Sequence, residues 1–354
     1  MTIISLQNWV EQRTAIIEYE NDSIYLYSYP NNDSSLPSKS LWIANTKKRL
    51  LKKSNINDDF AKGIQPYMPI KHCTKNGYIK DFKDINNWEI QWGLDQNSIA
   101  VYFKNNIVAI MPEWAGITSD FWGFSIGAKD ETPIAWPLKN DNIQIKRFLK
   151  EKMFLESWTS KQWELTQDNF LSLYRNLYKG EEKYFSADDN KWPPLGIHYC
   201  KSNNLEFLAT IGMSQLPMPE YGMPWEDNEE YRRIEIAMIF RSIPNFLPLA
   251  QYLSAQAKYP WHYGTHFAHG HTIPCKELLE VGSKTSYIIF VENAKFLPNI
   301  NIPTFDNKKI RLLFMIPIYE TEYNYALKNS SNELIKLIEE ADKDPFNIFR
   351  NSII

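Results

Sequence analysis

Short apolar runs in the C-terminal half constrain the fold of this chain more than any other sequence feature. They have the length and the β-branched or aromatic content of strands, and they span Leu205 to Ile211, Ile234 to Phe240, Tyr287 to Val291 and Ile310 to Ile316. The last run is apolar almost throughout, which is the pattern of a central strand covered on both faces. These runs predict a β-sheet in this half of the chain.

Helical patterns lie between and after these strands. Leu247 to Lys258 carries Pro248 in its first turn and then repeats apolar residues at helical spacing. Ser330 and Glu333 form a capping box ahead of an apolar stripe, which predicts a final helix. Strands interleaved with helices indicate an α+β fold, in which a mixed, mostly antiparallel sheet is flanked by helices.

The N-terminal half has strand patterns of its own. Ile24 to Tyr29 alternates with period two, and Ile99 to Phe103 followed by Ile107 to Met111 predicts a hairpin with a turn at Lys104-Asn105-Asn106. Pro30 to Ser40 is rich in Pro, Ser and Asn and predicts a surface loop.

Two helical patterns lie near the middle of the chain, at Asn142 to Trp158 and Thr166 to Tyr178. We place the domain boundary at the end of the first pattern. The prediction is therefore an N-terminal α+β domain over 1–155 and a second domain over 156–354.

Composition excludes several classes of protein. With 44% apolar residues, 12 Trp, 20 Tyr and 19 Phe, the chain can bury a large core and is not disordered. The formal net charge of −3 and the lack of long charge blocks argue against nucleic-acid or membrane partners. Because Met1 to Ile17 lacks a continuous apolar stretch and the three cysteines are widely spaced, we expect a cytoplasmic protein with reduced thiols.

Histidines cluster between Trp261 and Cys275. His262, His266, His269 and His271 are four of the six histidines in the chain, and imidazoles with a thiolate are good zinc ligands. A His-Glu-x-x-His motif is missing, however, so we expect no cofactor, and histidines that bond to backbone in a loop. A metal-dependent enzyme that uses the His262–His271 cluster is the alternative hypothesis, and half-exposed histidines also suit a contact surface.

An acidic, aromatic loop is the second candidate site. Aromatic side chains supply contact area at low entropic cost and carboxylates attract a basic partner, although a solvated loop would have the same composition. The residues predicted to bind a partner, including two of the histidines, are Tyr221, Trp225, Glu226, Asp227, Glu229, Glu230, His269 and His271.

Nucleophilic and nucleotide-binding motifs are missing from the sequence. There is no Gly-x-Ser-x-Gly elbow and no Gly-rich phosphate loop, and the 13 glycines leave little material for one. We therefore expect a protein that is not an enzyme.

Four motifs, in order, resemble a known family. They are Ile211-Gly212-Met213-Ser214 with Pro217-Met218, Arg233-Ile234-Glu235, Gly270-His271-Thr272-Ile273-Pro274, and Ile316-Pro317-Ile318-Tyr319-Glu320 with Glu322. In this order and spacing they resemble the suppressor-of-fused domain of bacterial proteins, over about the C-terminal 200 residues.

The resemblance implies an α+β domain without catalytic machinery that binds another protein. In bacteria such domains are associated with immunity to polymorphic toxins, so the resemblance implies an immunity protein that neutralises a toxin by direct binding. A regulatory scaffold that binds another cytoplasmic protein, unrelated to any toxin, is a third hypothesis. The sequence does not name the partner or the oligomeric state.

Overall fold

The computed structural model describes residues 1–31, 37–48, 59, 62, 64–116, 121–188, 191–220, 223–224, 228–305 and 307–354, and Asn228 only by its backbone. The chain divides into two compact units, Met1–Trp158 and Thr159–Ile354. The predicted boundary lies between residues 155 and 156, close to this division. That each unit is an independently folding domain stays a prediction.

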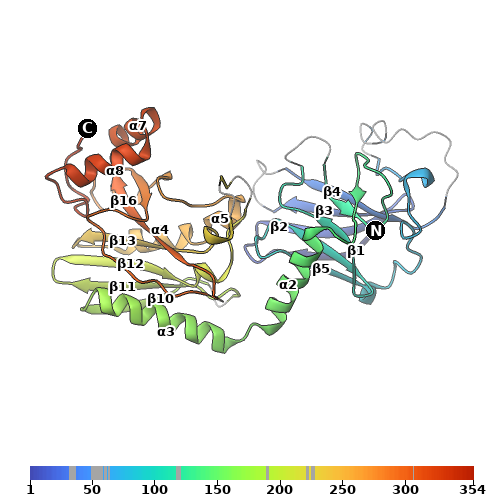
Figure 1. Ribbon diagram of the computed structural model, residues 1–354, viewed down its shortest axis with the longest axis horizontal. Helices are drawn as coiled ribbons and strands as arrows, with labels where there is room; N and C mark the ends of the chain where they lie inside the picture. Colours follow the sequence, from blue (N-terminus) through green and yellow to red (C-terminus); the bar gives the residue numbers. More distant parts are fainter. Residues whose placement is uncertain are drawn as a thin grey trace. The chain divides into compact units, whose positions relative to one another are not determined.

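The first unit is built on two sheets (Figure 1). One has four strands in sequential order: β1 (Thr2–Gln7), β2 (Arg13–Glu20), β3 (Ser23–Pro30) and β4 (Lys39–Asn45). The other has five: β5 (Trp88–Trp92), β6 (Ile99–Phe103), β7 (Asn106–Met111), β8 (Phe124–Ser125) and β9 (Trp136–Pro137). One apolar cluster, which includes Ile17, Leu26, Trp42 and Val101, draws on both sheets and forms the core.

Helix α2 (Ile143–Ser157) covers the second sheet of this unit. The side chain of Asn142 caps its first turn, and Phe148 is fully buried against β6 and β7. Arg147 joins the helix to the buried carboxylate of Asp95 and also bonds Glu151 at 2.8 Å. The helix is therefore held by packing and by a buried ionic network.

The second unit is built on a seven-stranded sheet in the order β10-β11-β12-β13-β16-β15-β14. The strands are β10 (Glu181–Ser186), β11 (Gly196–Ser202), β12 (Leu205–Ile211), β13 (Ile234–Arg241), β14 (Thr272–Pro274), β15 (Tyr287–Val291) and β16 (Arg311–Ile318). Of the neighbouring pairs, β13 and β16 run parallel and the others antiparallel. This confirms the predicted mixed, mostly antiparallel sheet.

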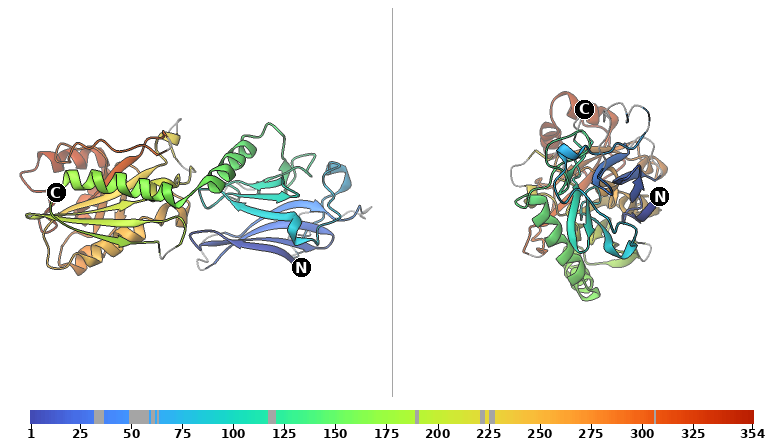
Figure 2. Two further views of the ribbon diagram at one scale, coloured as in Figure 1. Left: turned by 90° about the horizontal axis from the view of Figure 1, so that it is seen from below. Right: turned by 90° about the vertical axis from the view of Figure 1, so that its right-hand side faces the viewer.

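Helices cover both faces of this sheet (Figure 2). On one face, α3 (Ser160–Leu177) and α8 (Ser331–Glu340) pack with even-numbered residues of β16 such as Leu312 and Phe314. On the other face α4 (Leu247–Gln256) contacts β11 and β12, and Phe246, just before it, stacks on Tyr199 with ring centroids 3.9 Å apart. Since β16 is covered on both faces, the prediction of a central strand is confirmed.

Smaller elements complete this unit. They are the 3₁₀ helices η3 (Met213–Gln215) and η4 (Asn228–Glu230) and the helices α5 (Tyr259–Tyr263), α6 (Glu277–Glu280) and α7 (Glu320–Lys328). The first unit also has two 3₁₀ turns, η1 (Ile70–His72) and η2 (Ile85–Asn87). Among the described residues, no helix combines the length and the apolar content needed to cross a membrane.

A buried ion pair ties the C-terminal segment to α7. The two terminal guanidinium nitrogens of Arg350, Nη1 and Nη2, donate to the carboxylate of Glu322 at 2.6 and 2.8 Å. Neither side chain is more than 3% exposed, and the backbone N–H groups of Tyr319 and Ile353 donate to the same carboxylate at 2.9 Å each. These bonds hold residues 350–353 next to the start of α7, which follows β16.

Several element boundaries differ from prediction. The helix expected at Thr166 to Tyr178 begins earlier, because Thr159 and Gln162 form a capping box. The expected loop from Pro30 to Ser40 is wrong at both ends, since Pro30 closes β3 and Lys39 opens β4; residues 32–36 lie outside the described residues.

Candidate protein-binding surface

Two of the sequence motifs form one rigid support in the second unit. The carboxylate of Glu235 is fully buried and accepts hydrogen bonds from the backbone N–H groups of Gly212 and Ser214, at 3.0 Å each. The hydroxyls of Ser214 and Thr210 donate to it at 2.7 and 2.5 Å. Burial nevertheless raises the pKa of Glu235. The side chain of Glu235 therefore ties the turn after β12 to β13.

Two arginines fix the chain that leaves this turn. Arg233 donates to the carbonyls of Ser214 and Gln215 at 2.7 and 2.6 Å. The side chain of Arg232 donates to the carbonyl of Met218 at 2.8 Å, and the N–H of Met218 returns a bond to the carbonyl of Arg232 at 2.7 Å. The backbone of residues 214–218 is thus held in place by the two arginines up to Met218.

The acidic segment contains two described carboxylates, Glu229 and Glu230, that differ in their ion-pair partners. Glu229 bonds Arg232 at 2.8 Å and also pairs with Lys308. Although burial opposes it, bonding to Lys308 and Arg232 lowers the pKa of Glu229 to about 2. Glu230 is exposed, and within the described part of the chain its carboxylate has no ion-pair partner. Of the two described carboxylates, Glu230 is therefore the one left without an ion-pair partner for a basic group to meet.

Arg311, at the start of β16, organises the neighbourhood of this segment. Its guanidinium bonds both oxygens of Glu292 at 2.7 Å and donates to the backbone carbonyl of Glu230 at 3.0 Å. The same group lies 3.9 Å from the centroid of the Tyr231 ring, which is a cation–π contact. A single arginine thus connects the acidic segment to the sheet.

His269 contacts Glu292, the ion-pair partner of Arg311. Its Nδ1 accepts a hydrogen bond from the backbone N–H of Glu292 at 3.1 Å, so the proton of the neutral ring is on Nε2. That nitrogen lies 3.2 Å from Oδ1 of Asn332 in α8. The structure therefore brings the acidic segment and His269, which are far apart in sequence, to the two ends of the Glu292–Arg311 pair.

Two of the other histidines, His266 and His271, lie close together. His266 and His271 lie with ring centroids 5.1 Å apart, and burial, followed by the charge of His271, lowers the pKa of His266 to about 4. Burial raises the pKa of Cys275 to about 12. Within the described ranges, no three His, Cys, Asp or Glu side chains come close enough together to hold a metal ion.

The predicted binding residues are only partly described. Glu229, Glu230, His269 and His271 have the positions given above, and His271 is exposed. Tyr221, Trp225, Glu226 and Asp227 lie outside the described residues.

Sequence reasoning missed the residues that hold this surface together. Neither Arg311, the charged residue within the apolar run from Ile310 to Ile316, nor Glu292 is among the predicted binding residues. A charged residue opening an otherwise apolar central strand was the available signal, because such a charge must find a partner. The partners lie 19 and 81 residues away, which no local pattern reveals.

Comparison with known proteins finds a family match for part of the second unit. Residues 191–351 match the family model of Suppressor of fused protein (SUFU). Curated protein sequences gave no match.

Solved structures also resemble the chain. A crystal structure described as a SUFU homologue from Neisseria gonorrhoeae has 16% identity and a TM-score of 0.41, covering 55% of this chain and 98% of the other. The Sufu-Fu complex has 15% identity and a TM-score of 0.33, covering 49% and 76%. Drosophila Suppressor of Fused has 16% identity and a TM-score of 0.31, covering 49% and 42%.

Proposed function

We propose that this chain, whose C-terminal unit carries a suppressor-of-fused-like domain, is a non-enzymatic protein-binding module of the cytoplasm. The observation that carries the proposal is the family match over residues 191–351. One of the structures similar to the chain is that of a complex of Sufu with another protein, Fu. The proposed activity is therefore recognition of a second polypeptide.

The binding surface we propose is the one predicted from the sequence. It comprises Tyr221, Trp225, Glu226, Asp227, Glu229, Glu230, His269 and His271. The Glu235 support and the Arg311–Glu292 pair hold its described part in place, so that part needs little ordering when a partner binds. An interface of standard size buries about 1,600 Å² in total, with a few residues dominating the affinity.

The biological role we propose is immunity, in which the protein neutralises a toxin by stoichiometric binding. The domain's likeness to bacterial suppressor-of-fused proteins supports this role. Because neutralisation by binding needs no turnover, the absence of a nucleophile motif in the sequence is compatible with it.

The test begins with isolation of the partner from the native host and titration of the two purified proteins by calorimetry. We expect one-to-one binding, weakened about tenfold by Glu230→Lys, because the change reverses a charge at the rim of the interface. Glu340→Lys is the matched control, since Glu340 is also exposed but lies at the end of α8.

Co-expression then separates immunity from scaffolding. If the partner arrests growth when produced alone and the wild-type chain restores it, the immunity role stands. A partner that is harmless by itself points to a regulatory scaffold. Substrate conversion that is lost on replacement of His269 or His271 would instead establish the metal-dependent enzyme.

A further inference from the structure

Helix α2 carries a row of exposed apolar side chains on the side that turns away from its sheet. Ile143 and Met153 are 73% and 70% exposed, the two highest fractions among the large apolar side chains of the described residues. Leu149, on the same side of the helix, is 48% exposed. Single exposed apolar side chains are common on protein surfaces, but three along one helix form the pattern of a contact surface.

The opposite side of α2 attaches the helix to its sheet. Its buried residues are Gln144, Phe148 and Glu151. At 3.6 residues per turn, these three lie on one side of the helix and the three exposed apolar residues lie on the other. The exposed row can therefore be changed without opening the core of the unit.

Two lysines lie within the exposed row. Lys146 and Lys150 are exposed, and in the part of the chain that the structure describes neither has an ion-pair partner, since the ion pairs of α2 use Arg147 and Lys152. The two lysines are four residues apart, a spacing at which like charges on a helix repel each other. An acidic partner would relieve this repulsion and form ion pairs with both lysines.

The outer face of α2, which we define as Ile143, Lys146, Leu149, Lys150 and Met153, is long and narrow. From its first to its last residue it rises about 15 Å, close to three helical turns. A second helix laid along this face can cover all three apolar side chains, because the side-chain ridges of two helices repeat at matching intervals. Its complement is an amphipathic helix with carboxylates beside its apolar stripe.

A second copy of this chain does not have that complement. In an antiparallel two-fold pair of α2 helices, Lys146 would lie near Lys150 of the other copy, so like charges would meet. An anionic membrane surface is disfavoured by the formal net charge of −3 of the whole chain. The charges therefore favour an acidic protein segment as the occupant.

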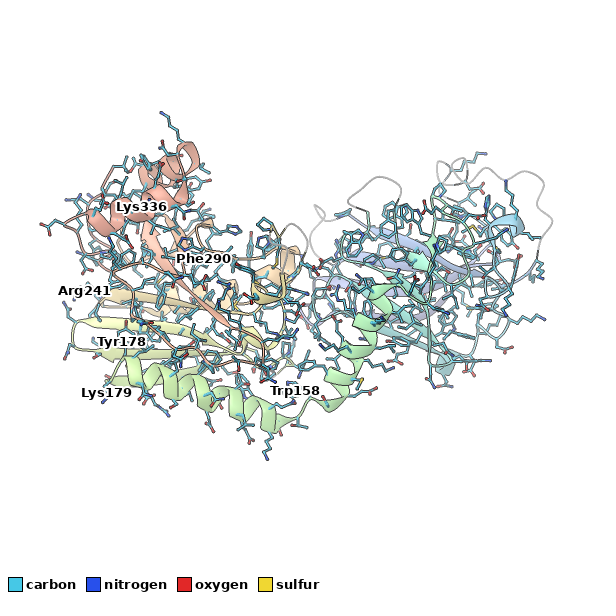
Figure 3. All side chains as sticks on the ribbon, in the orientation of Figure 1. Trp158, Tyr178, Lys179, Arg241, Phe290 and Lys336 are labelled. Atoms are coloured by element: carbon cyan, nitrogen blue, oxygen red, sulfur yellow. The ribbon has the colours of Figure 1, made fainter. Side chains whose placement is uncertain are left out.

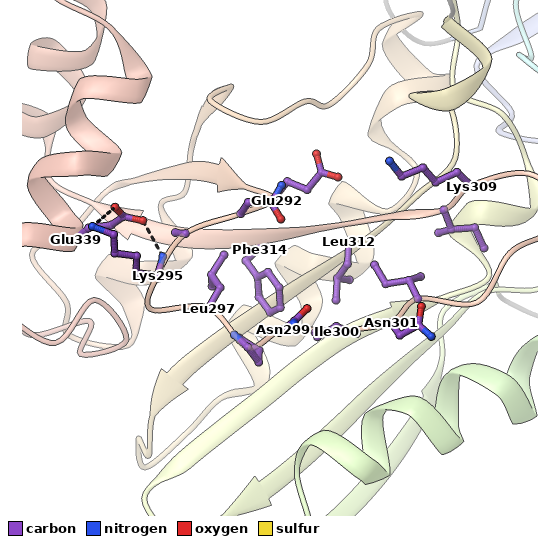
Figure 4. A pocket seen from close by; sticks show the side chains of 15 residues that line it. Glu292, Lys295, Leu297, Asn299, Ile300, Asn301, Lys309, Leu312, Phe314 and Glu339 are labelled. Atoms are coloured by element: carbon purple, nitrogen blue, oxygen red, sulfur yellow. Dashed lines mark hydrogen bonds and ion pairs between the residues drawn. The ribbon is translucent and has the colours of Figure 1, made fainter.

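The hollow beside β16 does not offer a comparable surface (Figure 4). Its volume is about 860 Å³, but Leu312 and Phe314, which line it, are each only 2% exposed. These two side chains already pack in the core with residues of α3 and α8. Exposed side chains on α2, rather than a cavity, therefore indicate the contact surface.

We propose that the outer face of α2 binds an acidic amphipathic helix of the partner protein. The inference rests on the proposed function, and it gives the N-terminal unit a part in holding the partner. The apolar stripe of the partner helix covers Ile143, Leu149 and Met153, while its carboxylates pair with Lys146 and Lys150.

The test uses three end-capped, fluorescently labelled helical peptides of about 18 residues, long enough to span α2. They share one leucine stripe, which is bordered by glutamate, by lysine or by glutamine. We expect the glutamate peptide to bind the full chain most tightly in fluorescence anisotropy. Changing Lys146→Glu and Lys150→Glu together should weaken that peptide about tenfold and favour the lysine peptide. Lys336→Glu, at an exposed lysine of α8 (Figure 3), is the control and should leave the affinities unchanged.

An apolar change separates helix binding from charge attraction alone. Met153→Ser should also weaken the glutamate peptide about tenfold, because serine offers no apolar surface for the peptide to cover. A photo-crosslinking residue at the centre of the peptide should attach to residues 143–153, which mass spectrometry of the digested product locates. The proposal is overturned if the glutamate peptide does not bind, if Met153→Ser leaves its affinity unchanged, or if the cross-links lie only outside residues 143–153.

Two further measurements test the other occupants. A dimer in analytical ultracentrifugation that Met153→Ser dissociates would assign the outer face of α2 to a second copy. Flotation with vesicles of phosphatidylserine and phosphatidylcholine that Met153→Ser abolishes would assign it to a membrane. Either result overturns the proposal. If Met153→Ser leaves the affinity for the native partner unchanged while Glu230→Lys lowers it, the α2 inference fails and the proposed function stands.

Discussion

Replacement of Glu322 by glutamine tests whether the buried ion pair holds the C-terminal segment. Glu322 is fully buried and Arg350 nearly so, and the two form a bidentate pair at 2.6 and 2.8 Å. Glutamine has almost the same shape but no charge. Its side-chain NH₂ would replace a carboxylate oxygen that now accepts hydrogen bonds, so N–H donors would face each other. Arg350 would then be buried without a counter-charge.

The expected loss is about 3–5 kcal/mol in the free energy of unfolding, the usual cost of removing one member of a buried pair. For a unit of this size, each kcal/mol lowers Tm by about 2–4 °C, so the transition of the second unit should move down by about 6–20 °C. Differential scanning calorimetry of the full chain measures the shift.

The control is Glu320→Gln, two residues earlier in the same helix. Glu320 is exposed in the first turn of α7, where its charge contributes only about 0.3–1 kcal/mol through the helix dipole. If Glu322→Gln lowers Tm no more than Glu320→Gln does, the buried pair does not stabilise the fold.

Lowering the pH should reduce the difference in the free energy of unfolding between the wild type and Glu322→Gln. Although burial opposes it, bonding to Arg350 lowers the pKa of Glu322 below its ordinary value. The stabilisation is therefore complete above the unfolded-state pKa of about 4.3 and is lost as the pH falls through the lower folded-state value. A difference in unfolding free energy that stays constant down to pH 2 would contradict this assignment.

Three further changes probe other parts of the structure. Glu235→Gln should lower the free energy of unfolding in urea by less than about 1.5 kcal/mol. Burial already disfavours the charge, and a glutamine oxygen can accept the bonds from Gly212 and Ser214. A loss as large as that of Glu322→Gln would refute this. Gly212→Ala should cost at least about 2 kcal/mol in the same assay, because its φ is 104° and a Cβ would lie 2.6 Å from the carbonyl oxygen of Pro194. Burial lowers the pKa of Lys39 to about 8. The wild type should therefore gain stability relative to Lys39→Met between pH 8 and 10, by up to about 1.4 kcal/mol per pH unit. Parallel profiles of unfolding free energy against pH for the two proteins would exclude the shift.

Local patterns in the sequence determined the elements that bury a continuous apolar face. Strands β12 and β15 have the predicted bounds, and Ser330 caps α8 as predicted. Apolar periodicity and capping depend on neighbours within a few residues, so they can be read without a structure. Strand β10 was missed because it is an edge strand whose residues are mostly exposed and polar, and it therefore lacks the apolar pattern.

Only the tertiary structure determined which segments meet. The parallel pairing of β13 with β16 joins chain segments separated by more than one intervening strand, and it places Arg311 between Glu230 and Glu292. The pairing of β15 with β16 ends at Val291, opposite Phe314, which the apolar sequence of β16 does not reveal. Local sequence thus specified the strands, whereas long-range hydrogen bonds and ion pairs set their order and the surface that they present.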